Sequence, residues 1–429
     1  MTDKEKTENI ISLAKRRGFI FPGSDVYGGL AGTWDYGPLG VILKRNIENL
    51  WWQMFVDERR DMYGIDAAIL MNPKVWQASG HVDTFTDPLV ECSNCHARLR
   101  ADKLDDPNKC PICGKERTFG EARQFNMMFK TNVGPVDDES SVAYLRPETA
   151  QGIFTNFKNV VDTFYPDLPF GLAQQGKAFR NEISPRDFIF RSREFSQMEI
   201  EYFVEPDKWQ EAFEHWRQAV WKWTEALGLP TESVHELEVP ENDRAHYSKR
   251  TIDFEYDFPI GREELLGLAY RTDFDLMNIQ NASGRSMEYT IKGTNTRFVP
   301  HVIEPSFGVE RALMAVLSSA YRVDEIEGEK REYLALPEHL APVKFAVSPL
   351  LKNKPELVAK AQEVFDLLHK KYARVMWDDN GNIGKRYRRQ DEIGTPYCVV
   401  VDFTTLEDGT VTIRSRDNLE QKRVKPEDI

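Results

Sequence analysis

The sequence predicts a mixed α/β (α+β) protein with two large domains, and three observations support this. The chain has 429 residues, which exceeds the usual size of one domain. Residues 179–203 contain two strand-like runs joined by a long charged loop. After residue 342, strand-like and helical runs alternate, as in a small α/β domain. We place the boundary within residues 336–342, which gives domains of residues 1–338 and 339–429.

Composition restricts the kind of protein. The net charge of −13 argues against indiscriminate binding of nucleic acid, although it leaves room for a local basic surface. Mean hydropathy is −0.53, and no apolar run reaches membrane-spanning length. The opening residues MTDKEKTENI lack the apolar stretch of a signal peptide. We therefore expect a soluble, cytoplasmic protein that does not contact a membrane.

The N-terminal part predicts a helix, then the glycine-rich stretch GSDVYGGLAGTWDYGPLG, then a second helix over residues 41–57. A third helix is predicted over residues 206–228, closed by Gly228. Its apolar residues recur at helical spacing, so we expect its tryptophans in the core: Trp209, Phe213, Trp216, Val220 and Trp223. A fourth helix is predicted to begin at Gly308.

Four cysteines form two Cys-x-x-Cys pairs inside a short insert of about residues 90–120. Cys92 and Cys95 are separated from Cys110 and Cys113 by 14 residues, close to the spacing of zinc ribbons. Four thiolates would close the site, so we expect a structural Zn²⁺, with His96 outside the ligand set. Cys398 stands in a valine-rich strand and is predicted to be core.

Residues 179–203 predict an antiparallel hairpin whose loop, about residues 183–194, is long enough to be functional. Period two places Ala178, Arg180 and Glu182 on one face of the first arm. In the second arm the polar and aromatic face carries Phe195, Gln197, Glu199 and Glu201. An arginine suits a phosphate, an aromatic ring a nucleobase, and carboxylates an ammonium or a cation. The alternative is a salt-bridged, solvated sheet face.

Beyond the boundary we predict strands over residues 343–350, 373–379 and 396–403, helices over 355–371 and 383–392, and a turn at Asp408-Gly409. The second helix concentrates basic residues beside Tyr387, and Tyr397 follows. This run is either a solvated helix face or a surface for RNA. The basic residues are Lys385, Arg386, Arg388 and Arg389.

Three motifs in order resemble those of class II aminoacyl-tRNA synthetases. Motif 1 is matched by TWDYGPLG and the helix after it. Motif 2 is matched by Phe179-Arg180-x-Glu182, a loop, and then Arg191-x-Arg193-Glu194-Phe195. Motif 3 is matched by Gly308-Val309-Glu310-Arg311. Within this class, the chain most resembles the homodimeric glycyl-tRNA synthetases. The segments that carry this resemblance are RPETAQGIF, RTDFDL, EPSFGVER and GKRYRRQDEIGTPYCV. The resemblance implies an antiparallel-sheet catalytic domain with a zinc-ribbon-like insert, and a C-terminal α/β anticodon-binding domain.

The resemblance also implies substrates and sites: ATP with Mg²⁺, glycine, a glycine tRNA, and a homodimer built through motif 1. It assigns Arg180, Arg311 and Glu182 as the catalytic residues. The residues it assigns to ATP are Arg180, Asn181, Glu182, Phe190, Arg191, Phe195, Glu264, Leu265, Gly308 and Arg311. Those it assigns to glycine are Arg100 (with Arg98 as the alternative), Glu148, Phe195, Gln197, Glu199, Glu304 and Ser306.

The implied reaction is attachment of glycine to tRNA through a glycyl-adenylate. Another class II synthetase, such as a threonyl or prolyl enzyme, is the nearest alternative. A synthetase-like protein that only binds nucleic acid is a second alternative. Such proteins lose the motif 2 and motif 3 arginines, whereas Arg180 and Arg311 are both present here.

Overall fold

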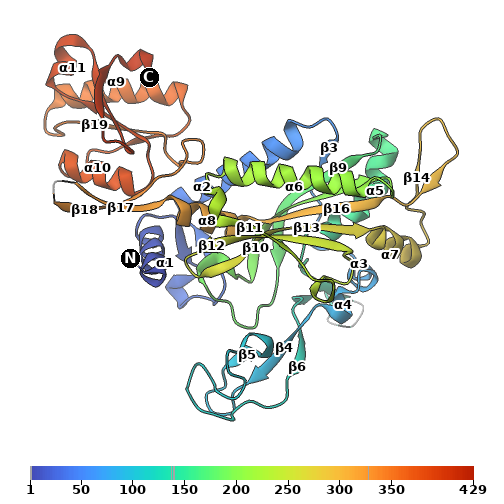
Figure 1. Cartoon of the computed structure of the whole chain (residues 1–429). Helices are drawn as coiled ribbons and strands as arrows, with labels where there is room; N and C mark the ends of the chain where they lie inside the picture. The colour runs from blue at the N-terminus through green and yellow to red at the C-terminus, as the bar shows by residue number, and fades with distance from the viewer. Residues whose placement is uncertain (1, 137, 139–140, 327) are drawn as a thin grey trace.

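The computed structural model describes residues 2–136, 138, 141–326 and 328–429. The larger part of the chain is built on a seven-stranded sheet in the order β11-β12-β13-β16-β10-β9-β3 (Figure 1). Neighbouring strands are antiparallel except β3, which runs parallel to β9 at one edge. The strands are β3 (Met62–Gly64), β9 (Phe170–Phe179), β10 (Glu194–Val204), β11 (Val234–Glu238), β12 (Arg250–Phe258), β13 (Gly261–Thr272) and β16 (His301–Gly308).

One face of this sheet is covered by α2 (Pro38–Trp52), α6 (Trp209–Ala226) and α8 (Val309–Ala320). Met198, Ile200 and Tyr202 of β10 point into this core, where they meet Trp216 and Trp223 of α6. The tryptophans predicted as core are therefore confirmed, with Trp209 only partly buried. On the opposite face, α5 (Ala150–Phe164) and α7 (Phe274–Ser283) cover one end of the sheet and leave the other end open to polar side chains.

The helix α2 approaches the chain before it so closely that two positions require glycine. A Cβ added at Gly40 would lie 1.8 Å from the carbonyl oxygen of Phe19. A Cβ at Gly37 would lie 2.4 Å from the carbonyl oxygen of Gly18. The glycines of GPLG are thus explained by packing. The predicted helix over residues 41–57 is confirmed as α2 and the π-helix η2 (Gln53–Asp57) that continues it.

The hairpin predicted at residues 179–203 is confirmed as β9 and β10, paired antiparallel from Phe170↔Phe203 to Phe179↔Glu194. Strand β9 ends at Phe179, so the prediction that Arg180 and Glu182 belong to its face is wrong. Both residues lie in the loop, because Asn181 N–H leaves the hairpin and donates to the Met127 carbonyl. The loop also folds back through the short helix η5 (Phe188–Phe190), whose three residues are buried.

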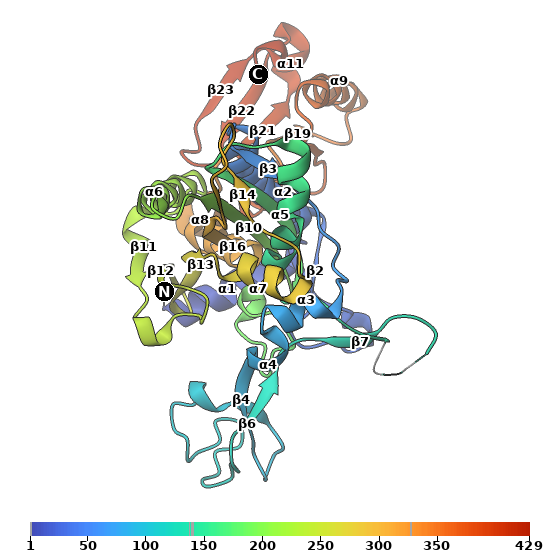
Figure 2. The ribbon, with the colours of Figure 1, turned by 90° about the vertical axis from the view of Figure 1, so that its right-hand side faces the viewer.

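The insert is a three-stranded sheet of β4 (Thr86–Glu91), β5 (Arg98–Arg100) and β6 (Arg123–Asn126), with β4 in the middle. It projects from the end of the molecule opposite the C-terminal domain in both views (Figures 1 and 2). The remaining elements before residue 335 are short connectors or flanking pieces. They are α1 (Asp3–Arg16), β1 (Ile20–Pro22), η1 (Asp25–Tyr27), β2 (Trp34–Tyr36), α3 (Pro73–Ala78), α4 (His81–Thr84), η3 (Ala101–Lys103), β7 (Lys130–Asn132), β8 (Val142–Tyr144), η6 (Thr231–Ser233), η7 (Glu241–Asp243), β14 (Tyr289–Thr290), β15 (Arg297–Phe298), β17 (Tyr321–Ile326) and β18 (Glu329–Leu334).

The C-terminal part has its own core and a five-stranded sheet in the order β20-β19-β21-β22-β23. The predicted helices are confirmed as α9 (Pro355–Lys371) and α10 (Ile383–Glu392). Asp408-Gly409 does not form a hairpin turn: Gly409, with φ of 76°, ends the short helix α11 (Phe403–Asp408) instead. The strands are β19 (Phe345–Pro349), β20 (Val375–Trp377), β21 (Tyr397–Val401), β22 (Val411–Ser415) and β23 (Gln421–Val424), followed by η8 (Pro426–Asp428). Cys398 is buried, as predicted.

The basic run in α10 is largely used inside the protein. Arg386 is buried and donates to the carbonyl oxygens of Pro349 and Gly381. Arg389 pairs with Asp378 at 2.5 Å, and Arg388 pairs with Glu329 at 2.6 Å. Of the four basic residues only Lys385 is exposed. Both predicted uses of the run, a solvated face and an RNA surface, are therefore wrong for Arg386.

No helix among the described residues is both long and apolar enough to span a membrane.

Candidate active site

Two cavities meet on the open polar face of the seven-stranded sheet. The first has a volume of about 220 Å³ and lies between β10, β13, the start of α8 and the 180–193 loop. The second, of about 260 Å³, lies over β10, β13 and β16. Four residues line both cavities, so the two spaces adjoin. They are Arg180, Gln197, Glu264 and Ser306.

The first cavity combines two guanidinium groups with aromatic rings. Arg180 lies over the Phe195 ring, 5.2 Å from its centre, and its Nε donates to the Pro147 carbonyl at 3.1 Å. Arg311 lies 4.9 Å from the centre of the Phe190 ring and 2.9 Å from a Glu264 carboxylate oxygen. The charge of Arg311 lowers the pKa of Glu264, which keeps that carboxylate ionised. Guanidinium groups beside a flat ring suit a nucleotide, with its phosphates and base.

Nine of the ten residues predicted to bind ATP line this first cavity, and Asn181 does not. Asn181 instead borders a separate hollow with Arg98 and Phe125, on the insert side of the loop. Glu182 is buried, and its Oε2 has no partner among the residues the structure describes, so an acceptor remains unused at this wall. Such an orphaned oxygen is suited to a donor on a bound molecule.

Arg100 was predicted near glycine, but the structure places it in the first cavity and not in the second. It is held there by Asp87, 2.7 Å from its Nη1, and by Asp102 at 2.7 and 3.1 Å. The alternative, Arg98, lies farther out and pairs with Glu91 at 3.0 Å. Arg100 therefore faces the nucleotide-like cavity. Phe195, predicted for both substrates, likewise lines only the first cavity.

The second cavity gathers the remaining residues predicted for glycine. Glu199 accepts hydrogen bonds from Gln197 and Ser306, both at 2.8 Å, and from Thr149 at 2.5 Å. Residue 199 faces 306 across the pair β10–β16, which brings the two side chains together. Glu148 and Glu304 complete the wall, and all three glutamates are buried. The prediction of a glutamate cluster at this place agrees with where the structure puts these residues.

The three buried carboxyls do not share one charge state. Burial raises the pKa of Glu199, and it raises the pKa of Glu304 to about 8 although Arg271 lies 2.6 Å away. Burial is also the largest single influence on Glu148, but the charge and hydrogen bond of His81, together with the charges of Arg271 and Arg180, outweigh it and lower the pKa of Glu148 to about 2. The pocket thus holds one firmly ionised carboxylate, that of Glu148, beside two carboxyls whose pKa is raised. Such a pocket favours a small cation.

Three buried residues next to this pocket were not among those predicted to bind a substrate. Arg271 is buried, bonds Asp275 at 2.7 and 2.8 Å, and lies 3.7 Å from the centre of the Tyr247 ring. Its signal was present in RTDFDL, where Arg271 and Asp275 stand four apart. His81 gave no signal, because it lies 67 residues before Glu148 in the chain. Glu201 is buried and neither carboxylate oxygen has a partner among the described residues.

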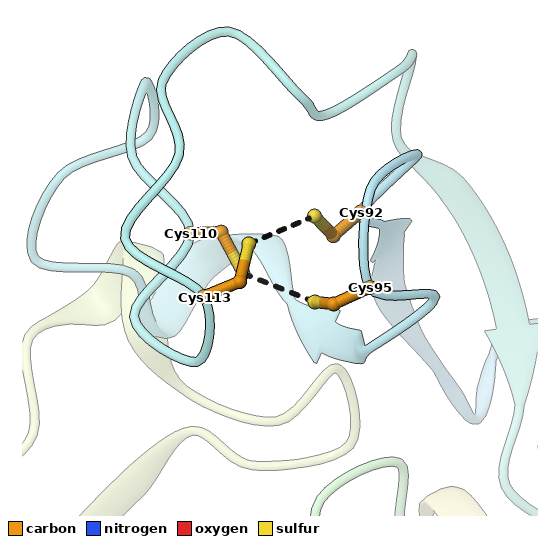
Figure 3. A group of neighbouring side chains, drawn as sticks. All are labelled: Cys92, Cys95, Cys110 and Cys113. Atoms are coloured by element: carbon orange, nitrogen blue, oxygen red, sulfur yellow. Dashed lines mark hydrogen bonds between the residues drawn. The ribbon is translucent and has the colours of Figure 1, made fainter.

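The four predicted cysteines form one cluster (Figure 3). The Sγ atoms of Cys92 and Cys113 are 3.7 Å apart, as are those of Cys95 and Cys110, and all four atoms lie within 4.8 Å of one another. Four sulfur ligands around a tetrahedral Zn²⁺ would lie about 3.8 Å apart. The donor set therefore fits a metal ion. His96 is exposed and pairs with Glu91 at 3.5 Å, outside the cluster.

Comparisons with known proteins agree across the chain. A family model described as "tRNA synthetase class II core domain (G, H, P, S and T)" matches residues 129–320, and one described as "Anticodon binding domain" matches residues 344–429. A glycine–tRNA ligase of Streptomyces coelicolor is 49% identical over 99% of this chain and 97% of its own length. One of Clostridium tetani is 48% identical over 100% and 98%.

A solved structure is similar in fold at much lower identity. It is a Giardia lamblia prolyl-tRNA synthetase in complex with prolyl-adenylate, with a TM-score of 0.71 and 14% identity. The similarity covers 99% of this chain and 76% of that one.

Proposed function

The chain belongs to the family of glycine–tRNA ligases, which are class II aminoacyl-tRNA synthetases, and we propose on that premise how its two cavities divide the work. The first cavity binds ATP and the second binds glycine. The observation that carries this assignment is that the two cavities adjoin at Arg180, which lines both. Adenylate formation requires the amino-acid carboxylate to meet the α-phosphate, and the shared wall is where they would meet.

The ATP assignment rests on three features of the first cavity. Arg180 and Arg311 supply cationic donors for phosphate oxygens, and the N-terminus of α8 at Gly308 adds a favourable field. Phe195 offers a face for the adenine ring. The orphaned Oε2 of Glu182 offers an acceptor for the exocyclic amine or a ribose hydroxyl. Class II synthetases use Mg²⁺ with ATP; here Glu264 would hold it, and the ion would neutralise phosphate charge.

The glycine assignment rests on the acids of the second cavity. Glycine offers only an ammonium and a carboxylate, so its recognition needs acceptors around the ammonium and walls without space for a side chain. Glu148, Glu199 and Glu304 supply the acceptors, and Ser306 is placed between the two cavities. A methyl group alone discriminates by about 1–3 kcal/mol, so close walls must add steric exclusion.

The chemistry follows from this placement. The glycine carboxylate attacks the α-phosphorus, the bond to the β-phosphate oxygen breaks, and pyrophosphate leaves with its electron pair. A terminal tRNA hydroxyl then attacks the glycyl carbonyl and releases AMP. Arg180 stabilises the charge that develops on the α-phosphate during the first step, and the protein supplies no covalent nucleophile.

Four further parts of the proposal concern the rest of the molecule. The cysteine cluster holds a structural Zn²⁺, and residues 339–429 form the domain that binds the anticodon of a glycine tRNA. Two chains form a homodimer through the motif 1 region, where Val26 and Tyr27 are 87% and 91% exposed beside β2 and α2. The enzyme works in the cytoplasm.

The test is ATP–pyrophosphate exchange with each of the twenty amino acids. Exchange that depends on glycine and is absent with alanine and serine supports the assignment. Exchange with threonine or proline in place of glycine overturns it.

A further inference from the structure

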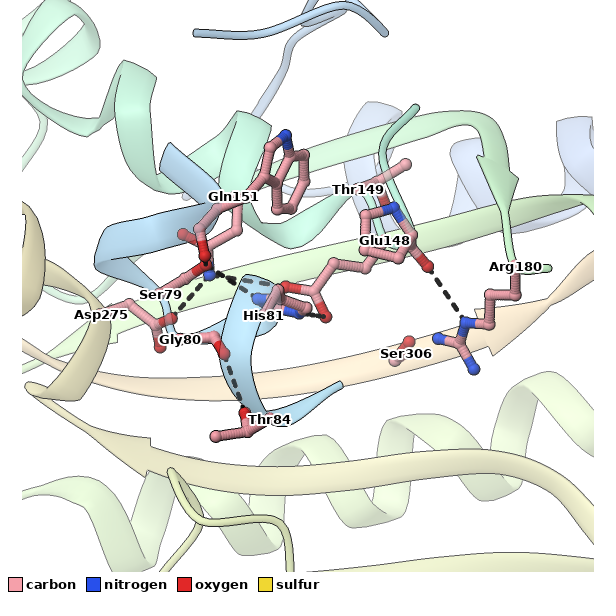
Figure 4. A network of polar contacts seen from close by, with 12 residues as sticks. Ser79, Gly80, His81, Thr84, Glu148, Thr149, Gln151, Arg180, Asp275 and Ser306 are labelled. Carbon is pink, nitrogen blue, oxygen red and sulfur yellow. Dashed lines mark hydrogen bonds and ion pairs between the residues drawn. The ribbon is translucent and has the colours of Figure 1, made fainter. Parts of the chain in front are cut away.

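His81 connects the base of the insert to the acid pocket. It begins α4 directly after Gly80, whose φ of 83° turns the chain so that the imidazole enters the protein (Figure 4). The imidazole is buried between the rings of Trp76 and Phe85, 5.5 and 5.6 Å away centre to centre. One ring nitrogen, Nδ1, lies 2.8 Å from the Ser79 hydroxyl, and the other, Nε2, lies 3.3 Å from a Glu148 carboxylate oxygen.

An ionised carboxylate only accepts hydrogen bonds, so the nitrogen that pairs with Glu148, Nε2, carries a proton. The Ser79 hydroxyl then either donates to Nδ1 or accepts from it and donates to the Trp76 carbonyl at 3.4 Å. When the Ser79 hydroxyl donates to Nδ1, the neutral imidazole carries its proton on Nε2. The imidazolium carries a proton there as well. In both forms an N–H group is therefore directed at the Glu148 carboxylate. The ring cannot turn away, because the two aromatic neighbours enclose it.

Glu148 needs such a neighbour because its own surroundings are poor in donors. Its other carboxylate oxygen is 3.4 Å from the Gln151 amide, and that amide also donates to Asp275 at 2.8 Å. The contacts of Glu148 to His81 and to Gln151 are similar in length, at 3.3 and 3.4 Å, but the Gln151 amide is shared with Asp275. The ion pair with His81 is therefore the better restraint on the direction of the carboxylate. A buried carboxylate without donors would turn or take up a proton, and it would then present no fixed acceptor to an ammonium.

The backbone that carries His81 is held from the insert. The side-chain amide of Asn126, the last residue of β6, donates to the carbonyl of Val82 at 2.7 Å and to that of His81 at 3.4 Å. The N–H of Met127 donates to the carbonyl of Phe85 at 3.0 Å. Helix α4 is thus tied on both sides to the strand that leaves the insert.

We propose that His81, fixed by Ser79, is a positioning residue that orients Glu148 toward the glycine ammonium and so sets the affinity for glycine. The proposal rests on the assignment of glycine to the second cavity. His81 itself does not line that cavity, so it acts through Glu148. Its loss should weaken glycine binding without changing ATP binding, because no residue of the His81–Glu148 contact lines the first cavity.

Four variants test this by glycine-dependent ATP–pyrophosphate exchange in the full-length, metal-loaded enzyme. His81→Ala should raise the KM for glycine by at least about tenfold, since a buried charged pair loses one partner, with the KM for ATP unchanged within about twofold. His81→Gln keeps an N–H that can reach Glu148 and should restore most of the loss. Ser79→Ala should raise the KM for glycine by about threefold, and adding it to His81→Ala should cause no further rise.

The matched control is His235→Ala, which removes another histidine–carboxylate pair. His235 lies 2.8 Å from Asp257 at the surface, away from both cavities. The KM values of the His235→Ala variant for glycine and for ATP should equal those of the wild type. An unchanged KM for glycine in His81→Ala, an equal rise for ATP, or a Gln variant no better than the Ala variant would each overturn the proposal. If the wild-type enzyme showed no glycine-dependent pyrophosphate exchange, the proposed function would be overturned instead.

Discussion

At the residue scale, the site depends on a few side chains that each serve two neighbours. Arg180 lines both cavities, and Arg271 joins Asp275 to Glu304 across the floor of the second. The three buried acids that line the second cavity have different partners: Glu199 has neutral donors, Glu304 has Arg271 and Glu148 has His81. The different partners explain why chemically identical carboxyls have different pKa values.

Replacement of Arg180 by alanine should abolish adenylate formation. The guanidinium is the cationic donor at the wall shared by both cavities, and loss of such a donor costs a factor of about 10²–10³ or more in rate. Glycine-dependent pyrophosphate exchange measures the effect directly. The control is Arg250→Ala, which removes a surface ion pair to Glu238 on the same sheet. Exchange by Arg180→Ala near the wild-type rate would contradict the assignment.

Glu304 should make the stability of the ligand-free enzyme depend on pH. Burial raises its pKa from 4.5 to about 8, so between these values the folded chain holds a proton that the unfolded chain has lost. The free energy of unfolding therefore falls as pH rises through this window. Glu304→Gln removes the contribution.

Thermal unfolding of both proteins at pH 6 and pH 8.5 measures this effect. From pH 6 to pH 8.5, the free energy of unfolding of the wild type should fall by about 2 kcal/mol more than that of the variant. A difference in unfolding midpoint that is the same at both values would contradict the raised pKa.

At the element scale, strand β10 shows how one strand serves both core and site. Alternate residues point to opposite faces, so Met198 and Ile200 enter the helix-covered core while Gln197 and Glu199 enter the pocket. The neighbours β9 and β16 fix the register that places residue 199 opposite residue 306. A slip of one residue would exchange core and site.

Removal of the metal should make the four insert cysteines reactive toward an alkylating reagent while Cys398 stays unreactive. With metal bound, none of the five thiols should react with iodoacetamide at pH 8. After chelation the four cluster thiols should become alkylated, as mass spectrometry counts them. Cys398 should stay unmodified until the chain unfolds, because burial raises its pKa to about 12. Alkylation of the four thiols before chelation, or of Cys398 together with them, would contradict this picture.

At the scale of the whole molecule, a buried arginine joins the two large parts of the chain. Arg331 of β18 donates to Asp324 of β17 at 2.8 and 2.5 Å, and it reaches Asp391 of α10 at 3.2 Å and the Arg416 carbonyl at 2.9 Å. Its side chain is 1% exposed. This contact fixes the C-terminal domain against the β17–β18 hairpin and hence against the catalytic sheet.

Replacement of Arg331 by methionine should lower the rate of tRNA charging but leave the rate of adenylate formation almost unchanged. Loss of one partner from a buried ion pair costs about 3–5 kcal/mol, which would loosen the junction. Pyrophosphate exchange should stay within about twofold of the wild type, since both cavities lie in the catalytic part. Charging of tRNA should fall by about tenfold or more, because it requires both parts to hold one tRNA. An equal fall in both activities would contradict the proposed division of the chain at residues 338–339.

The sequence by itself determined the elements and most of the site. Period two identified the β9–β10 hairpin, helical spacing identified α6, α9 and α10, and the cysteine spacing identified the cluster. Motif resemblance named nine of the residues that line the first cavity as ATP-binding, and five of those that line the second as glycine-binding. These features are local, since each depends on residues within about 30 positions of one another, and local patterns are what side-chain periodicity encodes.

Only the tertiary structure decided how distant segments share the site. It placed Arg100 with the first cavity, because Asp87 of β4 and Asp102 hold the guanidinium there. It turned Arg386 inward, where backbone carbonyls accept hydrogen bonds from its guanidinium group. It also brought His81 to Glu148 across 67 residues. The physical reason is the same in each case: a buried charge must find its partner in space, and the chain position of that partner leaves no periodic signal.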